Sequence, residues 1–297
     1  MVDITHKQNT LRVATAQATV VVGHQDTIDA IQNNQVPKGN VFEMAKTAGL
    51  LGVKQTPNLL PDCHPLPIEY TGIEYEITGL EIVIKMTVKT IYKTGVEVEA
   101  MHGASVVALT MYDMLKPIDK NVQISNIKLQ NKKGGKSDHF GKYEGNYSAS
   151  IITCSDTRTE KTDKSGNIIF DKLSSEGFHV SSPVIVEDNE EQIRTCVQGL
   201  IDQNINLIVL TGGTGLTSRD VTPEAIIPLI EKRLPGIEST FTKYGQERTP
   251  YSMLSRIVVG ASKNSLLVAL PGSSGGVKDG MQVLFPAVKH ALQLLVL

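Results

Sequence analysis

A carboxylate and a lysine in the first half of the chain have the spacing for acid–base chemistry. Asp113 and Lys116 lie three residues apart in a segment with a helical pattern, so both side chains lie on one face. The turns before them are largely apolar, which indicates that this helix end is covered. A lysine beside a carboxylate in a partly covered pocket can donate or accept a proton. The alternative is an ordinary surface ion pair, worth less than about 1 kcal/mol.

Other polar side chains that could contact a substrate lie in and near the proline-flanked segment Asp62–Pro67. Adjacent side chains in extended backbone point in opposite directions, so we do not expect Cys63 and His64 to share a metal ion. We expect His64 to act as a neutral hydrogen-bonding group in a rigid loop, with a buried structural histidine as an equal alternative. Glu97 and Glu99 begin the predicted helix, where carboxylates also favour the helix dipole.

Glycine-rich and basic segments offer sites for phosphate groups. Lys38-Gly39 precedes a predicted helix start, and Gly134–Ser137 is a flexible basic loop. The second segment resembles the end of a P-loop, but Gln130 stands where the first glycine is required, and a solvated linker is the alternative. In the second half, Thr211–Gly215 follows a buried strand, and its backbone N–H groups could cradle phosphate oxygens. A tight strand-to-helix turn explains this loop equally well.

Two carboxylates of the second half could serve such a phosphate site. Asp220 follows Arg219 just beyond the glycine-rich loop and could hold Mg²⁺ against substrate phosphates, although an Arg–Asp surface pair is the alternative. Asp188 follows a predicted strand and could add a second carboxylate, or simply cap the next helix. We expect Thr222 to be the N-cap of a helix in which Pro223 takes the first position.

The elements of the first half must bring its polar residues together. Alternating apolar and polar residues predict strands over 71–77 and 81–89, joined by a tight turn at Thr78-Gly79. Asn40 is placed to cap a helix, and residues 96–116 read as a second, long helix. The pattern predicts an α+β domain, an antiparallel sheet with helices on one face.

The second half alternates strands and helices more regularly. Buried strands are predicted at 150–153, 205–210 and 266–270, with an amphipathic helix over 193–201. Strand, glycine-rich turn and helix form the βα unit of an α/β, doubly wound, three-layer (Rossmann-like) domain with a parallel sheet. Ligands of such sheets bind at the carboxyl ends of the strands, where the turns at 211–215 and 271–276 must lie.

Length and composition bound the function. The chain has 297 residues, enough for two domains, and the polar Gly/Lys-rich stretch 131–146 reads as the linker. A formal charge of −2 and 5% aromatic residues argue against a nucleic-acid partner. The three cysteines form no CxxC pair, so neither a disulfide framework nor a structural zinc site is expected. The start lacks the apolar core of a signal peptide, and no apolar run could span a bilayer, so we expect a cytoplasmic protein without a membrane partner.

The first domain, expected over residues 1–143, resembles the MoaC family, the cyclic pyranopterin monophosphate synthases, from about Met1 to Asp138. The resemblance rests on motifs in the family's order: Met1–Ile4, Lys38-Gly39, Asp62–Leu66, Lys93–Ala100, Met111–Lys116 and Gly134–Ser137. It implies a ferredoxin-like α+β fold and homo-oligomers, hexamers or trimers of dimers, with sites at subunit interfaces. The implied reaction converts 3′,8-cyclo-7,8-dihydro-GTP to cyclic pyranopterin monophosphate and releases pyrophosphate, with no cofactor.

The resemblance to MoaC also implies a role for individual residues. It assigns catalysis to Asp113, Lys116 and Lys38. It assigns substrate binding to Arg12, Cys63, His64, Glu97, Glu99 and Lys136. Arg12, Lys38 and Lys136 would hold the triphosphate. The alternative, from a different class of protein, is a phosphate-binding regulator.

The second half resembles the molybdopterin-binding MogA/MoaB group over residues 147–297. The resemblance rests on the segments Thr211–Gly215, Arg219–Ala225 and Leu270–Ser273. Active members of the group convert ATP and molybdopterin to adenylyl-molybdopterin and pyrophosphate with Mg²⁺. The two functional aspartates of the group match Asp188 and Asp220, which would hold the metal. The implied molybdopterin and ATP site comprises Gly212, Gly213, Thr214, Gly215, Asp220, Asp188, Pro271, Gly272 and Ser273. The alternative is a non-catalytic binding or assembly module.

Overall fold

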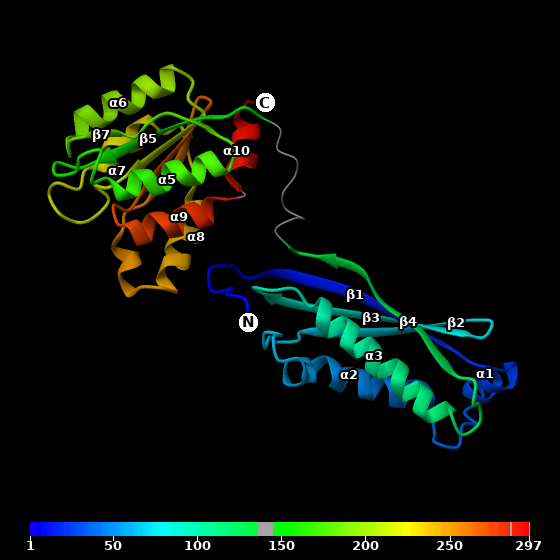
Figure 1. Ribbon diagram of the computed structural model, residues 1–297. Helices are drawn as coiled ribbons and strands as arrows, with labels where there is room; N and C mark the ends of the chain where they lie inside the picture. Colours follow the sequence, from blue (N-terminus) through cyan, green and yellow to red (C-terminus); the bar gives the residue numbers. More distant parts are fainter. Residues whose placement is uncertain (136–144, 286, 297) are drawn as a thin grey trace. The chain divides into compact units, whose positions relative to one another are not determined.

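The computed structural model describes residues 1–135, 145–285 and 287–296 (Figure 1). The chain forms two compact units that divide between Gly141 and Lys142, and each unit is described by itself. No helix in the described ranges is both long and apolar enough to cross a membrane.

The first unit is an antiparallel four-stranded sheet whose strands lie in the order β2-β3-β1-β4. Helices α2 and α3 lie side by side on one face of this sheet, as predicted for an α+β domain (Figure 1). Its elements are β1 (Thr10–Val21), α1 (Gln25–Gln32), α2 (Val41–Leu59), β2 (Tyr70–Thr78), β3 (Glu81–Tyr92), α3 (Glu97–Leu115) and β4 (Gln123–Lys133).

Local sequence signals set these elements. The alternating residues Ile82, Ile84, Met86 and Val88 of β3 are fully buried, which fixes the face of the sheet that α2 and α3 cover. Asn40 caps α2 as predicted, because its side-chain oxygen accepts a hydrogen bond of 3.0 Å from a backbone N–H one turn into the helix. The long helix predicted over 96–116 is α3.

The second unit is a mixed seven-stranded sheet in which β6 and β7 both pair with β5, followed by β8, β11, β10 and β9. Its strands are β5 (Ser148–Cys154), β6 (His179–Val180), β7 (Val184–Val186), β8 (Leu207–Thr211), β9 (Lys232–Arg233), β10 (Val258–Ser262) and β11 (Ser265–Leu270). Its helices are α5 (Lys164–Ser175), α6 (Glu190–Asp202), α7 (Thr222–Ile226), η1 (Ile227–Leu229), α8 (Pro235–Gln246), η2 (Pro250–Leu254), α9 (Ser274–Leu284) and α10 (Ala287–Val296). Helices α6 and α7 pack on one face, while α5, α8, α9 and α10 pack on the other.

The prediction of a parallel sheet is correct for β5, β6, β7, β8 and β11 and wrong for β9 and β10. Strands β10 and β11 form an antiparallel hairpin because Lys263 and Asn264 alone connect them, and a parallel pair needs a long crossover. Lys263 takes a left-handed backbone conformation with φ of 48° to make this turn. The carboxyl ends of β5, β7, β8 and β11 still meet at one edge of the sheet, where the turns at 211–215 and 271–276 lie as predicted.

Candidate functional site

The candidate catalytic residues of the first unit form one cluster at the end of α3. Asp113 accepts a hydrogen bond of 2.7 Å from Lys38 Nζ on Oδ2 and one of 2.7 Å from Lys116 Nζ on Oδ1. Lys38 also donates to the Asp113 backbone carbonyl at 2.8 Å. Lys38 comes from the loop before α2, whereas Asp113 and Lys116 lie at the end of α3, so the packing of the two helices brings the three residues together.

The two lysines set the charge state of this cluster. Hydrogen bonds from Lys116 and Lys38 lower the pKa of Asp113 to about 2, and donation to Asp113 raises the pKa of Lys116. Both lysines are therefore held beside a permanent carboxylate at neutral pH. The side chains of Asp113 and Lys116 are 53% and 52% exposed, so the prediction that this helix end is covered is wrong for the single chain.

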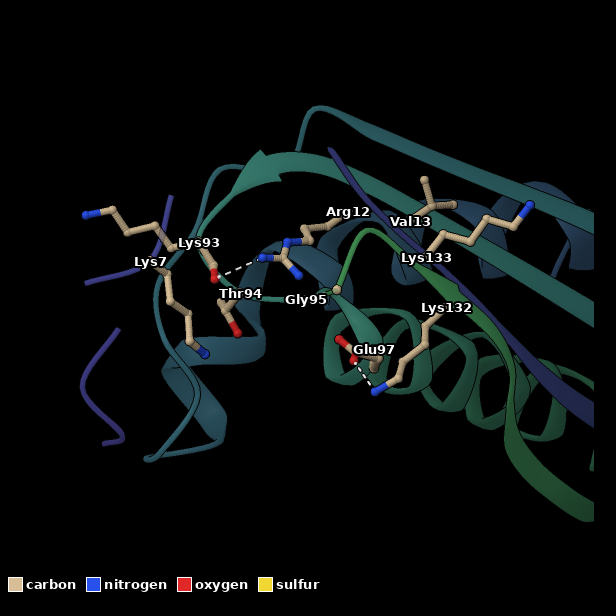
Figure 2. Close-up of a pocket in the computed structure, with 10 residues that line it drawn as sticks. Lys7, Arg12, Val13, Lys93, Thr94, Gly95, Glu97, Lys132 and Lys133 are labelled. Carbon is tan, nitrogen blue, oxygen red and sulfur yellow. Dashed lines mark hydrogen bonds and ion pairs between the residues drawn. The ribbon is translucent and has the colours of Figure 1, made fainter. Parts of the chain in front are cut away.

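A cationic cavity of about 370 Å³ opens at the other end of the same unit (Figure 2). Its lining comprises Lys7, Arg12, Val13, Lys93, Thr94, Gly95, Glu97, Lys132, Lys133 and Gly135. Arg12 is held by two backbone carbonyls, because Nε donates to Tyr92 O at 3.2 Å and Nη2 donates to Lys93 O at 3.3 Å. Among the described residues of this lining, Glu97 is the only carboxylate, and it pairs with Lys132 at 3.2 Å. The excess of cations suits a polyphosphate.

The cationic cavity and the lysine cluster lie far apart within one chain. Glu97 is the first residue of α3, and Asp113 lies in its last turn. At about 1.5 Å of rise per residue, the two positions are ~24 Å apart. The chain therefore does not bring Arg12 and Lys38 to one triphosphate by itself. Lys136, the third predicted phosphate ligand, lies outside the described residues.

Cys63 and His64 have separate partners, as their adjacent positions predicted. The thiol of Cys63 donates to Glu99 Oε1 at 3.1 Å, and His64 Nε2 lies 2.8 Å from the Val2 carbonyl oxygen. His64 is half-buried, which agrees with a hydrogen-bonding group in a loop rather than a buried structural histidine. Burial and the bond to Glu99 raise the pKa of Cys63 to about 12.

Glu99 lies in the first turn of α3 and is also a buried carboxylate. Its side chain is 1% exposed, and burial raises its pKa. Glu99 Oε2 is buried without a hydrogen-bond partner among the described residues. Glu97, by contrast, faces the cationic cavity, so the two first-turn carboxylates occupy different surroundings.

The second unit carries a cavity of about 300 Å³ at the predicted edge of its sheet. Its lining comprises Thr153, Cys154, Ser155, Asp156, Thr157, Arg158, Ser165, Asp188, Thr211, Gly212, Thr217, Arg219, Asp220 and Gly272. Residues that follow β5, β7, β8 and β11 thus converge on one space. This is the placement that the doubly wound pattern predicted for a ligand site.

The two predicted aspartates both line this cavity but differ in their surroundings. Burial and the nearby Asp156 raise the pKa of Asp188, and Asp188 Oδ1 is buried without a partner in the described part of the chain. Burial also acts on Asp220, but hydrogen bonds outweigh it and lower the pKa of this residue. Thr217 supplies two of these bonds to Asp220 Oδ2, at 2.8 Å from its N–H and 2.6 Å from its hydroxyl. Asp188 does not cap α6, because Asn189 takes that role.

Asp188 and Asp220 are two of the carboxylate donors in the lining of this cavity. The described ranges contain no group of three or more His, Cys, Asp or Glu side chains arranged to hold a metal. Magnesium, however, is commonly held by one or two carboxylates, waters and substrate phosphates. The unpartnered, buried oxygen of Asp188 is the donor that such an ion would satisfy.

The glycine-rich loop is a structural support as well as a lining segment. The Gly212 N–H donates to Leu270 O at 3.1 Å, and the Gly215 N–H bonds to the Asp220 carboxylate. Both amides are therefore used within the protein and do not form the predicted phosphate nest. Thr222 is the first residue of α7 rather than its N-cap, and its hydroxyl donates to Gly212 O at 2.9 Å. The prediction of Thr222 as a cap is wrong because this longer-range carbonyl takes the hydroxyl.

The other predicted residues of this site have mixed positions. Gly272 lines the cavity, and its carbonyl accepts bonds from Arg158 Nη2 at 3.0 Å and Ser165 Oγ at 2.9 Å. Ser273 accepts a bond of 3.1 Å from Gly276 and caps α9. The remaining predicted residues are not among those that line the cavity: Gly213, Thr214, Gly215 and Pro271.

Sequence reasoning missed the segment that follows β5. Ser155, Asp156 and Arg158 line the cavity beside the two aspartates. The available signal was the same one that located the glycine-rich turns, a polar run directly after a buried strand. Its residues contain no glycine and no motif spacing, so the sequence pattern does not distinguish them from an ordinary loop.

Known proteins resemble both halves of the chain. Residues 1–135 match the MoaC family, and residues 150–290 match the family described as probable molybdopterin binding domain. A molybdenum cofactor biosynthesis bifunctional protein of Chlorobaculum tepidum is 39% identical over 295 residues, which covers 99% of this chain and 94% of that protein. A cyclic pyranopterin monophosphate synthase of Clostridium perfringens is 45% identical over 142 residues, covering 47% of this chain and 89% of that protein.

The fold and the two cavities thus define a two-domain protein with a separate candidate site in each domain. The chain belongs to the family of molybdenum cofactor biosynthesis bifunctional proteins, with a MoaC domain first. The solved structure of the molybdopterin biosynthesis Mog protein from Mycobacterium ulcerans is similar to the second half. It is 35% identical with a TM-score of 0.48, and the match covers 52% of this chain and 99% of that chain.

Proposed function

We propose that the first domain converts 3′,8-cyclo-7,8-dihydro-GTP to cyclic pyranopterin monophosphate and pyrophosphate. The observation that carries this proposal is the joining of Lys38, Asp113 and Lys116 at 2.7 Å contacts, with Asp113 held as a carboxylate. The residues match the positions that resemblance to MoaC marks as catalytic. The relatives that match this half under the name cyclic pyranopterin monophosphate synthase support the assignment.

The cationic cavity and the lysine cluster have different tasks in this reaction. Forming a cyclic phosphate requires a hydroxyl oxygen to attack the α-phosphorus while pyrophosphate leaves, so the site must neutralise the leaving charge. The cationic cavity around Arg12 has that capacity. Lys38 and Lys116 supply protons to the developing pterin, and the contact with Asp113 favours the charged form of Lys116 until substrate arrives.

We infer that two copies of the chain complete each site. The lysine cluster and the cationic cavity are ~24 Å apart along α3, farther than one small nucleotide reaches. The exposed lysine cluster of one copy would then face the cavity of another, in a homo-oligomer of ferredoxin-like domains. The shared site and the ferredoxin-like fold are both what the resemblance to MoaC implies.

Mixing inactive chains tests this shared site. Arg12→Ala and Lys38→Ala chains are each expected to be inactive, and co-refolded mixtures should regain about one quarter of wild-type sites, because random pairing leaves one intact site in half of the dimers. A mixture with no recovered activity, from chains that form oligomers normally, would contradict the shared site. The activity of the unmixed wild type is measured in parallel, so a missing activity is distinguished from a missing complementation.

For the second domain we propose adenylylation of molybdopterin by Mg²⁺-ATP. In this transfer a molybdopterin phosphate oxygen attacks the α-phosphorus of ATP, and pyrophosphate leaves. Asp188 and Asp220 would hold the magnesium ion, which neutralises phosphate charge when bound. Arg158 and Arg219 supply cations to the lining of the same cavity. The unpartnered oxygen of Asp188 is the observation that carries this proposal.

The adenylylation test uses the full chain with molybdopterin, Mg²⁺ and ATP labelled on the α-phosphate. The expected result is labelled adenylyl-molybdopterin from the wild type, with loss of product in Asp188→Asn and Asp220→Asn. Molybdopterin binding without any labelled product would instead identify a non-catalytic binding module. Glu160→Gln, a surface change outside the cavity lining, is the matched control.

A further inference from the structure

Arg256 connects two ends of the loop that carries Asp220. It lies between η2 and β10, and its backbone N–H donates to Thr214 O at 2.9 Å. Its guanidinium reaches further into the loop, because Nε donates to Gly215 O at 2.8 Å and Nη2 donates to Asp220 O at 2.5 Å. The remaining guanidinium nitrogen, Nη1, forms an ion pair with Glu224 in α7.

These bonds hold a loop that has little regular structure of its own. Residues 212–221 run from the end of β8 to the start of α7 without a helix or strand. The start of this loop is held at Thr214 and Gly215, its end is held at Asp220, and the helix that follows is held at Glu224. A planar guanidinium can satisfy three acceptors in fixed directions at once, which a lysine ammonium on a flexible stem cannot reproduce.

The contacts also separate two tasks. Thr217 bonds to the carboxylate of Asp220 and orients the side chain, whereas Arg256 bonds to its backbone carbonyl and fixes the main chain. Arg256 is not among the residues that line the cavity, so it approaches the loop from outside. Ser255 adds a contact of 3.0 Å from its hydroxyl to that of Thr214 on the same outer side.

We propose that Arg256 is a positioning residue for the second domain's reaction. It holds the 212–221 loop so that Asp220 stays at the cavity beside Asp188, and it makes no contact with substrate. This inference rests on the proposed adenylylation for its catalytic consequence, but its structural part, the fixing of the loop, stands independently of any activity.

The test compares full-length Arg256→Lys and Arg256→Met with Arg233→Met. Arg233 is an exposed arginine of the same domain, on edge strand β9, with an ion pair of 3.0 Å to Glu238, so its loss is a matched control. Amide hydrogen exchange of residues 214–220 is measured by mass spectrometry. Adenylyl transfer is measured as kcat and as KM for ATP, and thermal unfolding reports whether each variant folds.

Both Arg256 variants should exchange the amides of 214–220 at least about tenfold faster than wild type, while Arg233→Met should not. A displacement of the Asp220 backbone by about 1 Å should lower kcat by roughly a hundredfold with KM for ATP changed less than about threefold. Arg256→Lys should show both the faster amide exchange and the lower kcat, although lysine keeps the positive charge.

Unchanged exchange in folded Arg256→Met would overturn the inference, whatever the activity. Faster exchange with a wild-type kcat would also overturn it, because the loop would then be free to move without consequence. If the wild type itself forms no adenylyl product while the exchange result is as expected, the proposed adenylylation fails and the loop-fixing role of Arg256 is supported.

Discussion

Replacing Gly212 with alanine tests whether the turn after β8 sets the geometry of the second cavity. Gly212 has φ of +101°, and a Cβ at this position would lie 2.3 Å from the Cys154 carbonyl oxygen. An ordinary contact begins at 3.4 Å, so the ends of β5 and β8 would have to separate by about 1 Å. Backbone strain of about 1–2 kcal/mol and overpacking of about 1–3 kcal/mol together lower the free energy of unfolding by about 2–5 kcal/mol.

Gly199 offers a control with the opposite sign in the same domain. It lies inside α6, and a Cβ there would meet no atom within 4 Å. Gly199→Ala should raise the free energy of unfolding by about 0.5–1 kcal/mol, because alanine favours the helix. Differential scanning calorimetry of the full chains measures both changes, with the first domain's transition as the internal reference.

The activity of the two glycine variants completes this prediction. A separation of about 1 Å at the strand ends should lower adenylyl transfer by roughly a hundredfold in Gly212→Ala, whereas Gly199→Ala should keep wild-type activity. If Gly212→Ala is as stable and as active as wild type, the close approach of Gly212 to Cys154 does not constrain the cavity. Destabilisation by Gly199→Ala would refute the reasoning from local space and helix propensity.

The first domain yields further predictions. Lys116→Ala and Lys38→Ala should each lower formation of cyclic pterin by at least about a hundredfold with folding retained. Lys85→Ala, which removes an exposed ion pair with Glu76, should not lower it. Equal losses of activity in all three variants would contradict the assignment. The Asp113 carboxyl should titrate near pH 2 by NMR, below its ordinary value, because Lys116 and Lys38 bond to its charged form. The stabilising contacts of the cluster are thus present at neutral pH and lost as the pH falls toward 2. Lys38→Met should raise the pH midpoint of the Asp113 titration. A titration midpoint near 4 in the wild type would show that the ion pairs do not persist in solution. Cys63, with a pKa of about 12, should alkylate with iodoacetamide at pH 8 about a thousandfold more slowly than a free cysteine, and a fast reaction would show that its bond to Glu99 is open.

Patterns local in the sequence predicted the parts of each site that lie on one element. The spacing of Asp113 and Lys116 places both on one face of α3, and the structure joins them through the same carboxylate. Lys38 joins them from 75 residues away, because α2 packs beside α3, and no spacing rule contains that contact. Resemblance to MoaC was needed to name it.

The parts that no local pattern could supply depend on distances across the fold. Resemblance to MoaC groups Arg12 and Lys38 around one triphosphate, but the single chain holds them at opposite ends of a 19-residue helix, so the grouping stays a prediction for two copies of the chain. Thr222 has the local signature of a helix cap, yet its hydroxyl bonds to Gly212 instead. The hairpin of β10 and β11 was missed because strands buried on both faces lack the alternation that marks an antiparallel pair.

The most direct measurement is a cyclic pterin assay on the whole chain. The purified protein is incubated with 3′,8-cyclo-7,8-dihydro-GTP, and cyclic pyranopterin monophosphate and pyrophosphate are quantified against the Lys116→Ala chain. The account predicts equimolar products from the wild type and none above background from the variant. A folded, oligomeric wild type that forms no product, or a Lys116→Ala chain that turns over at the wild-type rate, would contradict the central claim.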